Sequence, residues 1–218
     1  MTTIKSKPCK TCGSELHTAA FCRSKAAVNA RMAKKAAKPV VKRKKKLTAT
    51  QVLKKARDGQ YITKADEKIL FNYQKDKAWR AFSTYIRIRD CLATTGTTEY
   101  GVCITCSVRG DDEPKPYSMI QAGHAVGGRG NAVLFHEEIV NGQCSHCNRQ
   151  GNGGLAGDYG NYMTFLVRKY GLEHADELQR LKNAYLKLTY QDLKDIEKKY
   201  LEKTERLLNN TDKRTKLL

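Results

Sequence analysis

Two cysteine pairs near the middle of the chain constrain its fold more than any other feature. Cys103 and Cys106 form the first Cys-x-x-Cys pair, and Cys144 and Cys147 form the second. Four thiolates in two such pairs match the tetrahedral coordination that structural zinc requires, and two pairs so close together seldom arise by chance. We therefore expect a closed zinc site here, in preference to disulfides or scattered free thiols.

Two polar side chains accompany the cysteine pairs. His124 ends a segment with strand character, Tyr117–His124, and Asn148 directly follows the last cysteine. A neutral imidazole accepts a proton near neutral pH, and a carboxamide offers a hard oxygen to a divalent metal. These residue types suit phosphodiester hydrolysis, in which a base activates water and a metal relieves charge on the phosphate. The alternative for His124 is a structural histidine.

This arrangement resembles the core of the ββα-metal (HNH) nucleases, in the variant in which two zinc knuckles bracket the active site, as in phage endonuclease VII. The closer similarity is to the lambdoid-phage NinG (Rap) recombination endonuclease family. The similarity covers about Trp79 to Leu208, and it is weaker in the N-terminal cysteines and the basic linker. The segments that carry it are Ala122–His124, Gln143–Asn148, Gly151–Asn152, Phe82–Asp90 and Tyr170–Gly171.

The resemblance implies a nuclease of phage recombination that cuts branched DNA, such as Holliday junctions or D-loops, in the cytoplasm of the bacterial host. It implies that His124 is the general base and that Asn148, in a helix begun by Cys147 and Asn148, binds catalytic Mg²⁺ or Mn²⁺. Its products would carry 5′-phosphate and 3′-hydroxyl ends. The implied fold is small and α+β, with a zinc-stabilised ββα-metal (HNH-like) core between α-helices, preceded by a zinc-finger-like segment and a basic linker.

Two positions depart from the family's pattern. Gln121 stands where we expect an aspartate, three residues before the general base, and Ile139 stands where we expect an asparagine, five residues before Cys144. Asn141 could fix the loop in place of the missing asparagine. The second ligand of the catalytic metal is open among His136, Gln121 and a DNA phosphate, with a slight preference for His136.

These departures keep two other functions open. The chain could be a zinc protein that binds DNA or RNA without cutting it, or a generic HNH endonuclease that cuts linear duplex. Cleavage that requires a divalent metal separates the first alternative from a nuclease. Comparison of branched with linear DNA separates the second.

The formal net charge of +19 indicates a polyanionic partner, either nucleic acid or an anionic membrane surface. The sequence has no apolar run of about 18 residues and no apolar signal core at its N-terminus, so we expect neither a membrane span nor export. Cysteines spaced as knuckles then indicate metal ligands in a reducing cytosol. We therefore expect the partner to be nucleic acid, and the family resemblance implies that it is DNA.

A second group of candidate zinc ligands lies near the N-terminus, where Cys9, Cys12 and Cys22 could be joined by His17. The spacing from Cys12 to His17 is short, so a water could replace His17 or the fourth ligand could be absent. The alternative is an exposed tail with incidental thiols.

A strongly basic segment follows, because residues 23–57 contain fourteen lysines and arginines and no acidic residue. We expect a mobile arm, helical before Pro39, that contacts DNA phosphates without reading sequence; a solvated linker is the alternative. The candidate DNA contacts are Lys42, Arg43, Lys44, Lys45, Lys46, Arg87 and Arg129.

Helical periodicity predicts most of the remaining elements. We expect a helix over 63–92 and helices from Asn161, over His174–Leu188 and after a capping box at Thr189, with fraying from Asn209. The apolar stripe of the last helix could pack on the core or form a homodimer. Ala132–Phe135 is the candidate second strand. We divide the chain into a zinc-binding segment (1–24), a basic arm (25–62), the nuclease core with its leading helix (63–160) and C-terminal helices (161–218).

Overall fold

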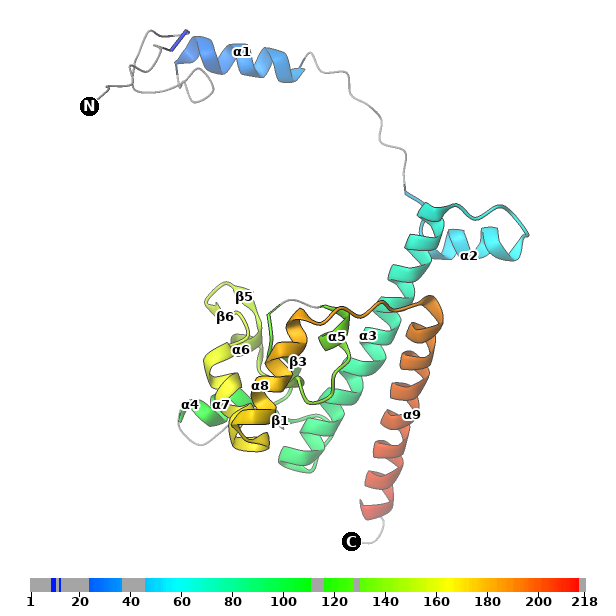
Figure 1. The fold of residues 1–218 in the computed structure, drawn as a ribbon, viewed down its shortest axis with the longest axis vertical. Coiled ribbons are helices and arrows are strands. Elements are labelled where there is room, and N and C mark those ends of the chain that lie inside the picture. Colours follow the sequence, from blue (N-terminus) through cyan, green and yellow to red (C-terminus); the bar gives the residue numbers. More distant parts are fainter. Residues whose placement is uncertain are drawn as a thin grey trace. The chain divides into compact units, whose positions relative to one another are not determined.

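The computed structural model describes residues 9, 10, 12, 24–36, 46–110, 116–127 and 130–215 (Figure 1). The chain forms two compact units, residues 1–46 and 47–218. In the first unit, helix α1 spans Lys25–Ala36, and the buried Cys9 packs with Ala27. The predicted zinc ligands His17 and Cys22 lie outside the described residues, as do the candidate DNA contacts at 42–45 and Arg129.

The second unit begins with helix α2, Ala49–Arg57, which lies within the segment that we assigned to the basic arm. A capping box at Thr48 starts this helix, because the Thr48 hydroxyl accepts from the Gln51 amide and the Gln51 side chain accepts from the Thr48 amide. Val52 is fully buried and Lys55 forms an ion pair of 2.7 Å with Asp66. These contacts hold α2 against the next helix.

Helix α3, Lys64–Thr95, confirms the helix predicted over 63–92 and extends it by three residues. A capping box between Thr63 and Asp66 starts it, and Gly96 ends it in the left-handed conformation with φ of 73°. Its apolar stripe lies mostly in the core, where Phe82 and Ile86 are fully buried. The thiol of Cys91 is also buried.

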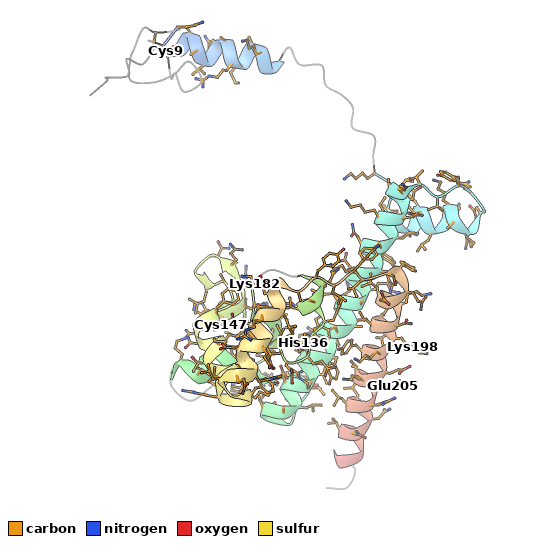
Figure 2. The ribbon with its side chains drawn as sticks, viewed as in Figure 1. Cys9, His136, Cys147, Lys182, Lys198 and Glu205 are labelled. Carbon is orange, nitrogen blue, oxygen red and sulfur yellow. The ribbon has the colours of Figure 1, made fainter. Side chains whose placement is uncertain are left out.

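Helix α9, Tyr190–Thr215, packs along α3 (Figure 1). Its apolar side chains Leu193 and Tyr200 are buried, so this stripe packs on the core. Lys198 and Glu205 point outward from the helix (Figure 2). The capping box at Thr189 is confirmed, but the expectation of fraying from Asn209 is wrong, because the helix continues to Thr215.

The centre of this unit is an antiparallel hairpin of β3, Gln121–His124, and β4, Val140–Gln143, in which Gln121 pairs with Gln143 and His124 with Val140. The predicted second strand at Ala132–Phe135 is wrong, because Asn131–Leu134 forms the short helix α5. The amides of Val133 and Leu134 both donate to the Gly130 carbonyl, which closes that helical turn. A run of four apolar residues does not by itself distinguish a strand from a helix.

Short elements surround this hairpin. Strands β1 (Gly101–Val102) and β2 (Pro116–Tyr117) pair with each other, as do β5 (Gln150–Gly151) and β6 (Gly154–Leu155). Helix α7 (Tyr159–Tyr170) is followed by Gly171. The helix expected over His174–Leu188 is shorter, because α8 (Leu172–Arg180) ends at Arg180 and Tyr185 is 90% exposed. The other short helices are α4 (Ile104–Arg109), α6 (Ser145–Asn148) and η2 (Leu181–Asn183).

Two hydrophobic clusters cover the two faces of the hairpin. Ala122 and Val140 pack with residues of α3 and α9, whereas Ile139 and its neighbours pack with α7 and α8. The fully buried Tyr162 of α7 donates its hydroxyl to the carbonyls of Gly123 at 2.8 Å and Ile139 at 3.0 Å. The hairpin is therefore fixed from both sides. The predicted small α+β class is confirmed, and none of the described helices is both long and apolar enough to cross a membrane.

Candidate metal centre and adjoining cleft

The four central cysteines converge as their spacing predicts. Cys103 precedes helix α4 and Cys144 precedes helix α6, so each pair sits on the first turn of a short helix. All four sulfur atoms lie within 4.8 Å of one another, with 3.5 Å between Cys106 and Cys147. A tetrahedron with zinc–sulfur bonds of about 2.3 Å has edges of about 3.8 Å. The cluster could therefore hold a zinc ion with little rearrangement.

Arg109, the last residue of α4, links this cluster to the rest of the fold. One guanidinium nitrogen, Nη2, donates to Cys147 Sγ at 3.0 Å and to Asp158 at 2.8 Å. Four thiolates around one Zn²⁺ leave a net charge of −2, which a neighbouring cation offsets. Arg109 therefore belongs to the metal centre, although we did not select it from the sequence. Its position three residues after Cys106 is the signal that was available.

Asn148 of helix α6 contacts Gln121 of strand β3. Asn148 is the last residue of α6, and its Nδ2 donates to Gln121 Oε1 at 2.9 Å. The expectation that Asn148 lies at the start of a helix is wrong, because α6 ends there and the turn of β5 and β6 follows. Of the candidates for the second metal ligand, the structure thus brings Gln121 into contact with Asn148.

Gly123 permits strand β3 to pack closely against the side chains of Gln143 and Asn148. A Cβ atom at residue 123 would lie 2.0 Å from Gln143 Oε1 and 3.1 Å from Asn148 Oδ1. Gln143 is fully buried, and its Nε2 donates to Thr105 at 3.3 Å and to the Gly157 carbonyl at 2.8 Å. Its Oε1 is buried without a conventional hydrogen-bond partner among the described residues, so the Cα–H of Gly123 is the group that faces it.

His124 lies on the face of β3 opposite to Gln121 and Gly123, because successive strand side chains alternate between faces. Its side chain is nearly buried, at 8% exposure, and its Nε2 lies 3.4 Å from the Leu134 carbonyl. The ring stacks on Trp79 of α3, with ring centres 5.1 Å apart and an angle of 21° between the planes. Trp79 belongs to the apolar side chains of α3. Nothing in the sequence indicated that it contacts His124.

A cleft of about 650 Å³ connects these residues, and Trp79, Gln121 and Asn148 all line it. Arg87, a predicted DNA contact, lines the same cleft and is exposed. His124 is not among the lining residues, but its stacking partner Trp79 is. The cleft therefore includes Asn148, whereas His124 lies behind Trp79 and does not line it.

His136 lies apart from this cleft. It follows α5, it is not among the residues that line the cleft, and Figure 2 shows it apart from Cys147. Its Nδ1 is buried and has no hydrogen-bond partner among the described residues, and burial lowers its pKa. No described contact joins it to Asn148. The predicted role of Asn141 is confirmed, because its side chain donates to the Glu138 carbonyl at 3.0 Å and to the Tyr162 hydroxyl at 3.3 Å.

Comparison with known proteins identifies a family for this chain. The sequence model of the family described as "Bacteriophage Lambda NinG protein" matches residues 1–210. No curated protein and no solved structure matches the chain significantly. Because the family match covers nearly the whole sequence, the chain belongs to the bacteriophage lambda NinG protein family.

Proposed function

We propose that the chain is a metal-dependent endonuclease that hydrolyses phosphodiesters in branched DNA during phage recombination. The observation that carries this proposal is the contact of Asn148 with Gln121 in a cleft that Arg87 also lines. The contact is supported by the hairpin, which carries Gln121, and by the short helix α6, which carries Asn148 beside two of the four cysteines. The resemblance to HNH nucleases also implies two strands followed by a helix, but with the metal ligand at the start of that helix and not at its end. Family membership supports the phage recombination setting.

The side-chain oxygens of Asn148 and Gln121 would hold the catalytic Mg²⁺ or Mn²⁺ once the ion replaces the hydrogen bond from Asn148 Nδ2 to Gln121 Oε1 and the Asn148 amide turns its Oδ1 toward the ion. Both are neutral and hard, and they suit an ion that keeps several of its waters and takes other ligands from substrate phosphate. When bound, such an ion polarises the phosphate and stabilises the departing 3′ oxygen. The cysteine cluster would hold zinc as a scaffold, because four thiolates leave no open coordination position.

His124 would serve as the general base. A proton on its Nε2 can be donated to the Leu134 carbonyl, which makes Nδ1 the nitrogen that accepts a proton from water. Stacking on Trp79 holds the plane of the ring, whereas the nitrogens lie at the ring edge, where a stacked neighbour does not cover them. His124 is nearly buried and does not line the cleft, so this role requires that DNA binding open a path for water to its ring.

Arg87 and the net charge of the chain would attract the DNA. The Arg87 guanidinium lies at the cleft, where its Nη2 donates to the Thr84 hydroxyl at 3.0 Å. A formal charge of +19 raises the local concentration of a polyanion around the molecule. Phosphate contacts of this kind position the DNA but read no sequence.

A DNA-binding protein that does not cut is the second candidate. Gln121 is neutral where the family's pattern has an acidic residue, and Glu99 is the one carboxylate among the described residues that line the cleft. A metal held only by amides binds more weakly than one held by carboxylates. This candidate predicts tight DNA binding without hydrolysis in either Mg²⁺ or Mn²⁺.

Cleavage of a labelled four-way junction tests the proposal. The zinc-loaded protein is incubated with Mg²⁺ or Mn²⁺ beside His124→Ala, Asn148→Ala and a linear duplex of the same sequence. Tyr185→Ala is the control, because this exposed side chain does not line the cleft. We expect metal-dependent cutting of the junction that is lost in both site variants and retained in the control. Binding without cutting would favour the second candidate, and equal cutting of the linear duplex would favour a generic nuclease.

A further inference from the structure

We propose that the cleft beside Asn148 binds one unstacked DNA base, and that an unpaired nucleotide at a branch is what it recognises. The placement of this base next to the scissile phosphate rests on the proposed nuclease function. Binding of the base does not require cleavage, so the two can be tested separately.

The size and lining of the cleft suit a nucleotide. Its volume of about 650 Å³ lies within the range of about 300–1,000 Å³ that is common for small-molecule sites. Trp79 and Ile88 contribute half-buried apolar surface, and Met119 is 79% exposed at the turn between β2 and β3. Aromatic faces and thioethers are polarisable surfaces on which any base can stack.

The polar groups of the cleft suit the remainder of a nucleotide. Arg87 is the cation available to a phosphate, and hydroxyl groups can accept and donate hydrogen bonds at base edges. Glu99 is the one anion among the described lining residues and would repel a phosphate that lay near it. The hydroxyl groups belong to Ser83, Thr84, Thr98 and Ser118.

A base inside a duplex cannot enter such a cleft, because both of its faces are covered by neighbouring base pairs. Extrusion of a base costs a few kcal/mol, and the cost is least where the base is already unpaired. A branch point or a single-stranded flap offers such a base. The cleft therefore provides a physical reason for selectivity toward branched DNA that requires no contact with a particular sequence.

Trp79 allows this proposal to be measured directly, because it is the single tryptophan of the chain. The full-length zinc-loaded protein, without added Mg²⁺ or Mn²⁺, is titrated with a short oligothymidylate and with a blunt linear duplex of equal length. We expect saturable quenching of the tryptophan fluorescence by the oligothymidylate and little quenching by the duplex.

Substitutions then locate the binding site, with the affinity for labelled oligothymidylate measured by anisotropy. Loss of one base–aromatic stack costs about 1–3 kcal/mol, so Trp79→Ala should weaken binding about 5- to 150-fold. Met119→Ala should weaken it several-fold, and Trp79→Phe should retain most of the affinity. Tyr185→Ala removes an exposed aromatic ring away from the cleft and should change nothing.

The outcomes separate this proposal from the nuclease function. Equal quenching by duplex and oligothymidylate, or unchanged affinity in both Met119→Ala and Trp79→Ala, would overturn the base site. If Trp79→Ala does not fold, Met119→Ala alone decides, because Met119 is exposed. Junction cleavage without oligothymidylate binding would overturn only the base site. Oligothymidylate binding that depends on Met119, without any cleavage, supports the base site and removes the nuclease.

Discussion

Substitution of Gly123 by alanine tests how the hairpin is packed. The added Cβ would lie 2.0 Å from Gln143 Oε1 and 2.8 Å from Gln143 Cδ, both too close for any real contact. Gln143 is fully buried and cannot move without weakening its bonds to Thr105 and the Gly157 carbonyl. Overpacking costs about 1–3 kcal/mol, and a buried polar group left unpaired costs about 1–3 kcal/mol.

These two costs are partly offset, because alanine loses about 0.5–1 kcal/mol less conformational entropy than glycine on folding. We therefore expect Gly123→Ala to lower the free energy of unfolding by about 3 kcal/mol. Denaturant unfolding of the zinc-loaded protein, followed by far-UV circular dichroism, measures the change. Gly160→Ala is the matched control, since a Cβ there would meet nothing within 4 Å.

A second variant identifies the cause of the loss. Gln143→Ala removes the side chain that the new Cβ would strike, so the double variant Gly123→Ala/Gln143→Ala should lose less stability than the two single losses added together. If Gly123→Ala unfolds at the same denaturant concentration as the unchanged protein, the close approach of residues 123 and 143 is not as described. Additive losses would show that the clash with Gln143 is not the cause.

Four other predictions follow from the described contacts. Removal of zinc should unfold the core, and an unchanged melting transition in protein shown to contain no zinc would contradict this. Arg109→Ala should weaken zinc binding about 10- to 100-fold, as read from the zinc released to a chromophoric chelator, whereas the exposed Arg168→Ala should not. The hydrogen bond from Lys55, and then those from Thr63, lower the pKa of Asp66 to about 2. The ionised Asp66 therefore stabilises the fold fully above its unfolded pKa of 3.8, and this stabilisation is lost as pH falls toward 2. Hydrogen exchange of the α2 amides should rise in that window, and Asp66→Asn should remove the pH dependence. Leu193→Ala should cost about 2–5 kcal/mol without changing the sedimentation coefficient, because Leu193 is buried within the chain.

The features that the sequence predicted correctly depend on short-range chemistry. The cysteine cluster follows from pairs of cysteines with two residues between them. The starts of α3 and α9 follow from capping boxes at Thr63 and Thr189. Each of these patterns is complete within about four residues, so no knowledge of the tertiary structure is needed to recognise it.

The features that the sequence did not predict depend on contacts between distant segments. Val140–Gln143 has one apolar residue and no alternation, and it is a strand because Gln121–His124 pairs with it. Helix α5 is the exception, because its amides bond to the nearby Gly130 and a short apolar run does not by itself distinguish a strand from a helix. The stacking of Trp79 on His124 joins residues 45 positions apart, and no local pattern encodes it.

The position of Asn148 shows how a scaffold metal could control a hydrolytic site without taking part in the chemistry. Asn148 directly follows Cys147, and its own amide donates to the Cys144 carbonyl. Both neighbours in this turn are therefore cysteines of the cluster. Loss of the metal would release the two cysteines and with them the turn that directs Asn148 to Gln121. The short helix α6 has four residues and buries only Cys147, so nothing in the helix itself would preserve its geometry.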